Sequence, residues 1–184
     1  ATNVPSYSYS NMFLGCTGLI TAPSLPATTL QQGCYQRMFK GCTNLVNAPE
    51  LPATDLTITG SVYNGVYEEM FNGCTSLVNA PALPATALSS YCYAMMFRDC
   101  ISLTAAPELP ATILKAYCYK DMFRGCASLN KITMLGETLA TQSLYDWVNG
   151  VAANGIFTKS PNMTTLPSGN SGIPNGWTVQ DYQN

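Results

Sequence analysis

The chain has 184 residues, of which 47% are hydrophobic and only 10% are charged, and its formal net charge is −2. That length suffices for one domain with a substantial core, whereas the charge excludes the basic surface that binds nucleic acid phosphates. On the basis of this charge, we expect no nucleic acid partner. No apolar run approaches the roughly 18 residues that span a bilayer, so we also expect no transmembrane segment.

A Met-Phe pair recurs along the chain and marks five similar units. The pairs begin at Met12, Met38, Met70, Met96 and Met122, so that the steps are 26, 32, 26 and 26 residues. Self-similarity at such a period predicts a stacked solenoid whose units bury their apolar faces against one another. We assign residues 1–136 to a five-repeat solenoid and residues 137–184 to a C-terminal cap.

Each unit begins with a pattern typical of a short helix. The second copy places four apolar side chains at positions i, i+3, i+4 and i+7, namely Tyr35, Met38, Phe39 and Cys42. This spacing predicts a two-turn amphipathic helix. Gly41 follows it where a helix often ends in a left-handed residue.

A short strand and a proline-shaped return complete the unit. Residues 45–48 form an extended stretch that ends at Pro49, which lacks the N–H of a continuing strand. Packed helices need more space than paired strands, so the stack should curve with its strand side concave. The expected fold class is therefore α/β, a solenoid with one short helix and one short parallel strand per repeat.

The side chains that recur in every copy are expected to form a common core. They include Phe13, Phe39, Phe71, Phe97 and Phe123, and the column Cys16, Cys42, Cys74, Cys100 and Cys126. Cys34 and Cys42 would lie about 12 Å apart along a helix, too far for a disulfide, so we expect buried free thiols. The chain has no histidine and no Cys-x-x-Cys pair, and we expect no metal and no cofactor.

The motif Phe-x-x-Cys-x-x-Leu precedes each short strand, for example at Phe39, Cys42 and Leu45. It resembles the BspA-like leucine-rich repeats of bacterial surface proteins of Bacteroides type, over residues 7 to about 136. The resemblance implies a right-handed, curved leucine-rich-repeat solenoid, exported to the cell surface or beyond, that serves adhesion or protein binding. Here the repeat is longer than the common form, and Ala48-Pro49 replaces the usual Ile-containing strand.

One unit departs from the regular step and supplies the first candidate ligand site. The insertion at residues 57–66 combines a β-branched run with an Asn-Gly turn, which predicts a protruding hairpin. It is either a neutral loop or a recognition loop with Tyr63, Asn64 and Ile58 as contacts, because a rigid exposed aromatic anchors many interfaces.

The concave strand face is the second candidate. Its polar side chains include Asn47, Asn79, Glu50 and Glu108, which could accept a peptide or a glycan.

The last residues leave the Met-Phe pattern and predict an α+β cap. Leu144, Trp147, Val148 and Val151 lie at helical spacing. Residues 156–158 and 177–179 are predicted to form strands. A terminal unit of this kind would cover the apolar end of a solenoid.

An enzymatic function is not expected from this inventory. Without histidine, a Ser or Cys nucleophile lacks its usual base, and the adjacent Glu68 and Glu69 are expected on a solvated face rather than as a glycosidase pair. We expect a monomeric, non-enzymatic binding module for an unknown protein or glycan. The alternative is a structural spacer or stalk in a larger surface assembly.

Overall fold

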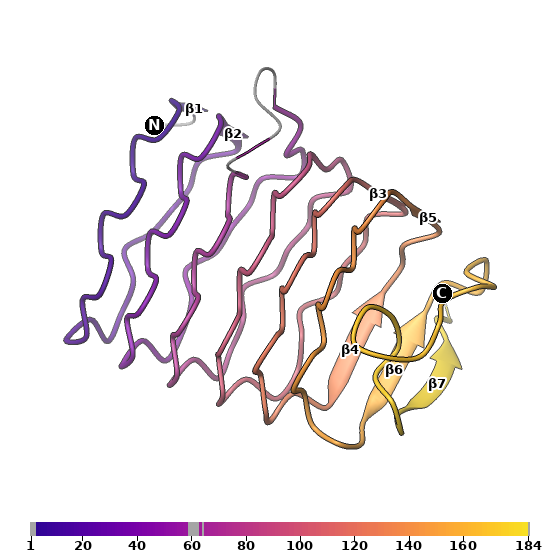
Figure 1. Cartoon of the computed structure of the whole chain (residues 1–184). Helices are drawn as coiled ribbons and strands as arrows, with labels where there is room; N and C mark the ends of the chain where they lie inside the picture. The colour runs from indigo at the N-terminus through magenta and orange to yellow at the C-terminus, as the bar shows by residue number, and fades with distance from the viewer. Residues whose placement is uncertain (1–2, 59–62, 64, 184) are drawn as a thin grey trace.

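The chain is a parallel β-solenoid of about seven turns, which confirms the predicted solenoid architecture (Figure 1). It is described by a computed structural model that covers residues 3–58, 63 and 65–183. Each coil combines a turn segment with an extended stretch, and successive coils stack from the N-terminal to the C-terminal end. The turn segments are residues 6–15, 32–41, 66–73, 90–99, 116–125 and 141–150.

The helix predicted in each repeat is wrong, because no helix forms anywhere in the described residues. Alternate amides of a turn segment point in different directions. The amide of Met38 donates to the carbonyl of Tyr35 at 3.2 Å, while the amide of Phe39 donates to the carbonyl of Met70 in the next coil at 3.0 Å. An α-helix would instead bond each amide to the carbonyl four residues earlier. Half of the amides therefore join neighbouring coils.

Left-handed backbone at every fourth residue produces this alternation. In the second turn segment Gly33, Arg37 and Gly41 have φ angles of 59°, 56° and 74°. Each segment thus repeats every four residues, close to the 3.6 of an α-helix. Apolar spacing of i, i+3, i+4 and i+7 fits both geometries, which explains why the sequence pattern indicated a helix.

Identical side chains from successive turn segments stack face to face inside the solenoid. The ring centroids of Phe71 and Phe97 lie 5.7 Å apart with planes 8° from parallel, and those of Phe97 and Phe123 lie 5.7 Å apart. Phe39, Phe71, Phe97 and Phe123 are fully buried. Phe13 lies in the first turn segment and Cys16 directly follows that segment, at the end of the stack, where Phe13 is only partly buried and Cys16 is exposed.

The strands are short and pair in parallel between coils. Their bounds are β1 Asn3–Val4, β2 Thr29–Leu30, β3 Ile113–Leu114, β4 Lys131–Met134, β5 Thr138–Leu139, β6 Ile156–Lys159 and β7 Thr178–Asp181. β1 pairs with β2 and β3 pairs with β5 along one narrow edge, while β4, β6 and β7 form a three-stranded sheet on the extended side. Closer to the N-terminus that side carries isolated bridges, such as Thr21 with Asn47 and Asn47 with Asn79.

The predicted α+β cap is also wrong, because residues 141–150 form a sixth turn segment. Phe123 donates its amide to the carbonyl of Trp147 at 2.8 Å, and Gln142, Asp146 and Gly150 have the left-handed backbone of earlier segments. The supposed helix pattern is therefore another copy of the turn pattern. The two strands expected in this region correspond to β6 and β7.

Candidate binding site

Three tyrosine side chains form a stacked row on the outer surface. We call Tyr63, Tyr91 and Tyr117 the tyrosine row. The rings of Tyr91 and Tyr117 lie 4.8 Å apart and 14° from parallel, and the ring of Tyr63 lies 6.0 Å from that of Tyr91 at a tilt of 42°. Tyr63 is 64% exposed, whereas Tyr91 and Tyr117 are half-buried. The row therefore ends in a large, accessible aromatic surface.

The insertion supplies a ring that the regular repeat cannot place at this point. Tyr91 and Tyr117 occupy a column in which the third coil has Gly65. A Cβ at Gly65 would lie 1.9 Å from the carbonyl oxygen of Tyr91, so a side chain there is excluded by backbone. Tyr63, two residues earlier, extends the row instead, and its carbonyl oxygen accepts a hydrogen bond of 2.7 Å from Gln32 Nε2.

The phenol of Tyr91, in the middle of the row, is uncharged at neutral pH. Burial, together with the neighbouring phenols of Tyr117 and Tyr63 and the carboxylate of Glu68, raises the pKa of Tyr91. A neutral phenol offers an apolar face and one hydroxyl that can both donate and accept a hydrogen bond. Such groups suit a neutral ligand with flat apolar faces and polar edges.

The backbone beneath the row is fixed by a buried carboxylate. Glu68 accepts hydrogen bonds from Gln36 Nε2 at 2.9 Å and from the amide of Gly65 at 3.2 Å. Burial raises the pKa of Glu68 above its usual range, against the effect of these hydrogen bonds. Glu68 was predicted on a solvated face, which is wrong, because the inter-coil geometry turns it inward.

Glu69 is likewise buried rather than solvated, and it links two coils through charge. It accepts a 2.7 Å hydrogen bond from Arg37 Nε and pairs with Lys40, both from the preceding coil. Burial opposes its ionisation most strongly, yet the hydrogen bonds and charges of Lys40 and Arg37 together lower the pKa of Glu69. This arrangement is an ion pair that joins neighbouring coils.

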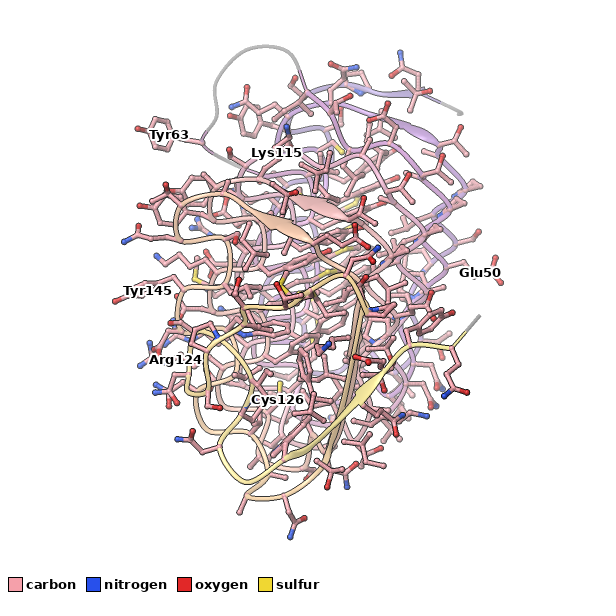
Figure 2. All side chains as sticks on the ribbon, turned by 90° about the vertical axis from the view of Figure 1, so that its right-hand side faces the viewer. Glu50, Tyr63, Lys115, Arg124, Cys126 and Tyr145 are labelled. Carbon is pink, nitrogen blue, oxygen red and sulfur yellow. The ribbon has the colours of Figure 1, made fainter. Side chains whose placement is uncertain are left out.

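The other predicted ligand residues are dispersed. Ile58 packs against the core, and Asn64 and the tip of the predicted hairpin lie outside the described residues. Asn47 and Asn79 are exposed and joined by a 2.9 Å hydrogen bond between their amide groups. Figure 2 shows Glu50 on the opposite side of the molecule from Tyr145 and Arg124, which lie on the turn-segment side.

Glu108 is exposed on the same extended stretches as Glu50, where it contacts the hydroxyl of Tyr182 at 3.3 Å. The structure therefore does not unite the insertion with the polar residues of the extended side. Sequence reasoning missed Tyr91 and Tyr117. A signal for them existed, since Tyr-Cys-Tyr occurs at residues 91–93 and 117–119, where the second and third copies have Gly-Cys-Tyr and Gly-Val-Tyr and the first copy has Tyr-Ser-Tyr.

Seven of the eight cysteines are buried in the interior. In the regular column the thiol of Cys74 donates to the carbonyl of Phe39 at 3.1 Å, and that of Cys126 donates to Phe97 at 3.0 Å. Burial raises the pKa of Cys74 and of Cys126 to about 12. Within the described residues, no group of His, Cys, Asp or Glu side chains could hold a metal ion.

Alkylation should separate one thiol from the others. In the folded chain at mildly alkaline pH, iodoacetamide should label Cys16, which is exposed, and react about 100-fold more slowly with the seven buried cysteines. Peptide mass spectrometry after timed quenching measures each rate, and denaturant should make all eight reactive. Equal rates at Cys16 and Cys126 in the folded chain would contradict the burial of this cysteine column.

No protein-family model, no curated protein and no solved structure matches this chain. Among its described residues there is no helix with the length and apolar character required to cross a membrane.

Proposed function

We propose that this chain is a non-enzymatic binding module, exported to the bacterial cell surface or beyond, and that the tyrosine row is its ligand contact. The observation that carries the proposal is the 64% exposure of Tyr63 at the end of a row that Tyr91 and Tyr117 support from behind. Exposed tyrosines held in place by neighbours supply contact area at a small cost in conformational entropy.

A neutral glycan or an uncharged polypeptide segment is the ligand class that fits. Its apolar faces would pack on Tyr63, and its hydroxyl or amide groups would pair with the phenol edges. A chain with 10% charged residues and a net charge of −2 offers little to a strongly charged partner. The repeated Phe-x-x-Cys-x-x-Leu motif supports the assignment to BspA-like adhesion and protein-binding modules.

Substitution within the row tests the proposal. On an array of glycans and matrix proteins, Tyr63→Ala should lower the signal for any ligand that the native chain binds by about tenfold or more. Tyr145→Ala is the matched control, because Tyr145 is an exposed tyrosine of the turn-segment side that lies outside the row. Unchanged binding by both Tyr63→Ala and Tyr117→Ala would exclude the row as the contact.

The second candidate function is a spacer or stalk module in a larger surface assembly. It is favoured by the uniform stacking of the interior, with Phe ring spacings of 5.5 to 5.7 Å through all five regular coils. A native chain that binds nothing on the arrays would favour this role.

A further inference from the structure

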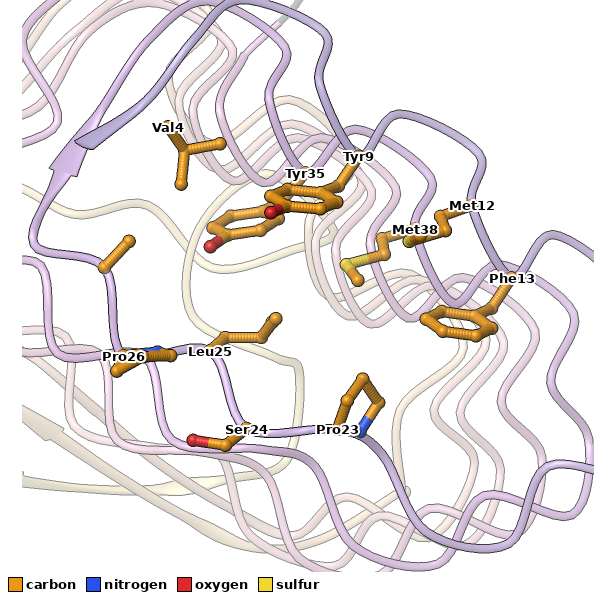
Figure 3. A pocket seen from close by; sticks show the side chains of 11 residues that line it. Val4, Tyr9, Met12, Phe13, Pro23, Ser24, Leu25, Pro26, Tyr35 and Met38 are labelled. Atoms are coloured by element: carbon orange, nitrogen blue, oxygen red, sulfur yellow. The ribbon is translucent and has the colours of Figure 1, made fainter. Parts of the chain in front are cut away.

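The N-terminal end of the solenoid exposes side chains that are buried in every later coil. Met12 is 57% exposed, whereas its equivalent Met38 is 1% exposed. Tyr9, Phe13 and Leu25 border a cavity of about 340 Å³ that opens at this end, with Met38 at its inner side (Figure 3). The open end is therefore a cross-section of the core.

The backbone at this end presents a row of hydrogen-bond acceptors. Inside the stack, carbonyls of alternate residues accept amides of the preceding coil, as Cys34 accepts from Tyr9 at 3.0 Å and Met38 accepts from Phe13 at 2.9 Å. The equivalent carbonyls of the first turn segment accept no hydrogen bond from any described residue. They belong to Ser6, Ser8, Ser10, Met12 and Leu14.

The opposite end differs in both polarity and cover. The outward groups of its turn segment are amides, and the loop at residues 168–173 covers two of them. Asp146 donates its amide to Ser171 Oγ at 2.9 Å, and Val148 donates its amide to the carbonyl of Asn170 at 3.2 Å. Trp147 Nε1 donates to the carbonyl of Gly172 at 2.8 Å. The column of turn segments thus has a donor end, where the amides of Asp146 and Val148 are covered, and an acceptor end, which is open.

We propose that the N-terminal end is a docking surface for one further coil of the same repeat, stacked in the same sense as the coils within the solenoid. Such a coil offers amide donors at every second residue, which the acceptor row requires. Its Tyr, Met and Phe side chains would fill the cavity as those of each coil fill the space against the next. The contact continues the interface already present between the first and second turn segments.

A second folded copy of this chain does not meet these requirements. Two N-terminal ends placed together would oppose one acceptor row to another, leaving the carbonyls without donors. The donor end of a second copy is covered by residues 168–173. The occupant is therefore a repeat segment with its donor side free, recognised by the pattern Tyr-x-x-Met-Phe-x-x-Cys.

An added repeat tests the docking directly. A copy of residues 27–52 placed before Ala1 keeps the register, because Ala1-Thr2 repeats Ala27-Thr28 and Ala53-Thr54. In this variant the rate of Met12 oxidation by hydrogen peroxide should fall about tenfold or more, toward that of Met38. The control carries the same 26 residues in scrambled order and should leave Met12 as reactive as in the native chain.

A second experiment supplies the same repeat as a separate peptide of residues 27–52. The peptide is titrated into the native chain, whose methionines carry ¹³C-methyl labels for NMR. The Met12 methyl signal should shift and the Met38 signal should shift less, while the scrambled peptide should shift neither. Equal Met12 reactivity in the extended and scrambled variants, with no shift by the peptide, would overturn the proposal. So would a concentration-dependent dimer of the native chain in which Met12 is protected.

Discussion

Replacing Phe97 with alanine should lower the free energy of unfolding by about 3–5 kcal/mol, since truncation of a buried aromatic leaves a cavity that the surroundings fill only partly. Phe97 is fully buried and stacks on Phe71 and Phe123, each at 5.7 Å. Rigid backbone hydrogen bonds between coils limit the collapse of neighbouring coils into the space. Denaturant titration monitored by circular dichroism measures the loss.

Phe13→Ala is the matched control for the same chemical change. Phe13 is partly buried and stacks on Phe39 at 5.5 Å, but it borders the open cavity at the end of the stack. Its truncation should cost about 1 kcal/mol, because no closed cavity forms. Equal losses at Phe13 and Phe97, or a loss below about 1 kcal/mol at Phe97, would refute the stacked aromatic core.

Gly155→Ala should lower the free energy of unfolding by about 2–3 kcal/mol through overpacking. Gly155 directly precedes β6, and an added Cβ would lie 2.3 Å from the carbonyl oxygen of Asn130 and 2.8 Å from its carbonyl carbon. The carbonyl of Gly155 also accepts the amide of Thr178 at 2.9 Å. The methyl group would therefore force apart the backbones of neighbouring coils.

The control for this change is Gly18→Ala, since a Cβ at Gly18 would meet no atom within 4 Å. Thermal unfolding of the two variants in parallel gives the comparison. Gly18→Ala should leave the unfolding midpoint close to that of the native chain. If Gly155→Ala had the same midpoint as Gly18→Ala, the coils that contain Gly155 and Asn130 would not be in close contact.

The sequence predicted the stack but not the conformation of its units. The recurring Met38-Phe39 pattern identified the buried side chains correctly, because burial depends only on which residues share a face. It could not separate a helix from turns that repeat every four residues, since both place Tyr35, Met38, Phe39 and Cys42 on one side. The distinguishing feature is left-handed backbone at Arg37, Glu69 and Met95, whose residue types rarely adopt that conformation.

The region after residue 136 was misinterpreted for a related reason. Trp147-Val148 replaces the Met-Phe pair, so the sixth turn segment was not recognised as a repeat. Its spacing, however, is the same, from Leu144 to Val151. An aromatic Trp at the end of the stack packs on Tyr119 and Phe123, which explains the substitution physically.

The candidate site was predicted only in part. Tyr63 was identified because the insertion breaks the period, and it is indeed highly exposed. Its place beside Tyr91 and Tyr117 is available because position 65 cannot carry a side chain. A Cβ at Gly65 would collide with the backbone of Tyr91. That exclusion is a contact between coils, and the linear sequence does not contain it.

The alternation of hydrogen bonds in the turn segments is the feature on which the whole account depends. Through-hydrogen-bond scalar couplings between amide nitrogens and carbonyl carbons measure it directly in a ¹⁵N,¹³C-labelled chain. The amide of Phe39 should couple to the carbonyl of Met70, and the amide of Met38 to that of Tyr35. A coupling from the Phe39 amide to the carbonyl of Tyr35, as in an α-helix, would contradict the solenoid described here.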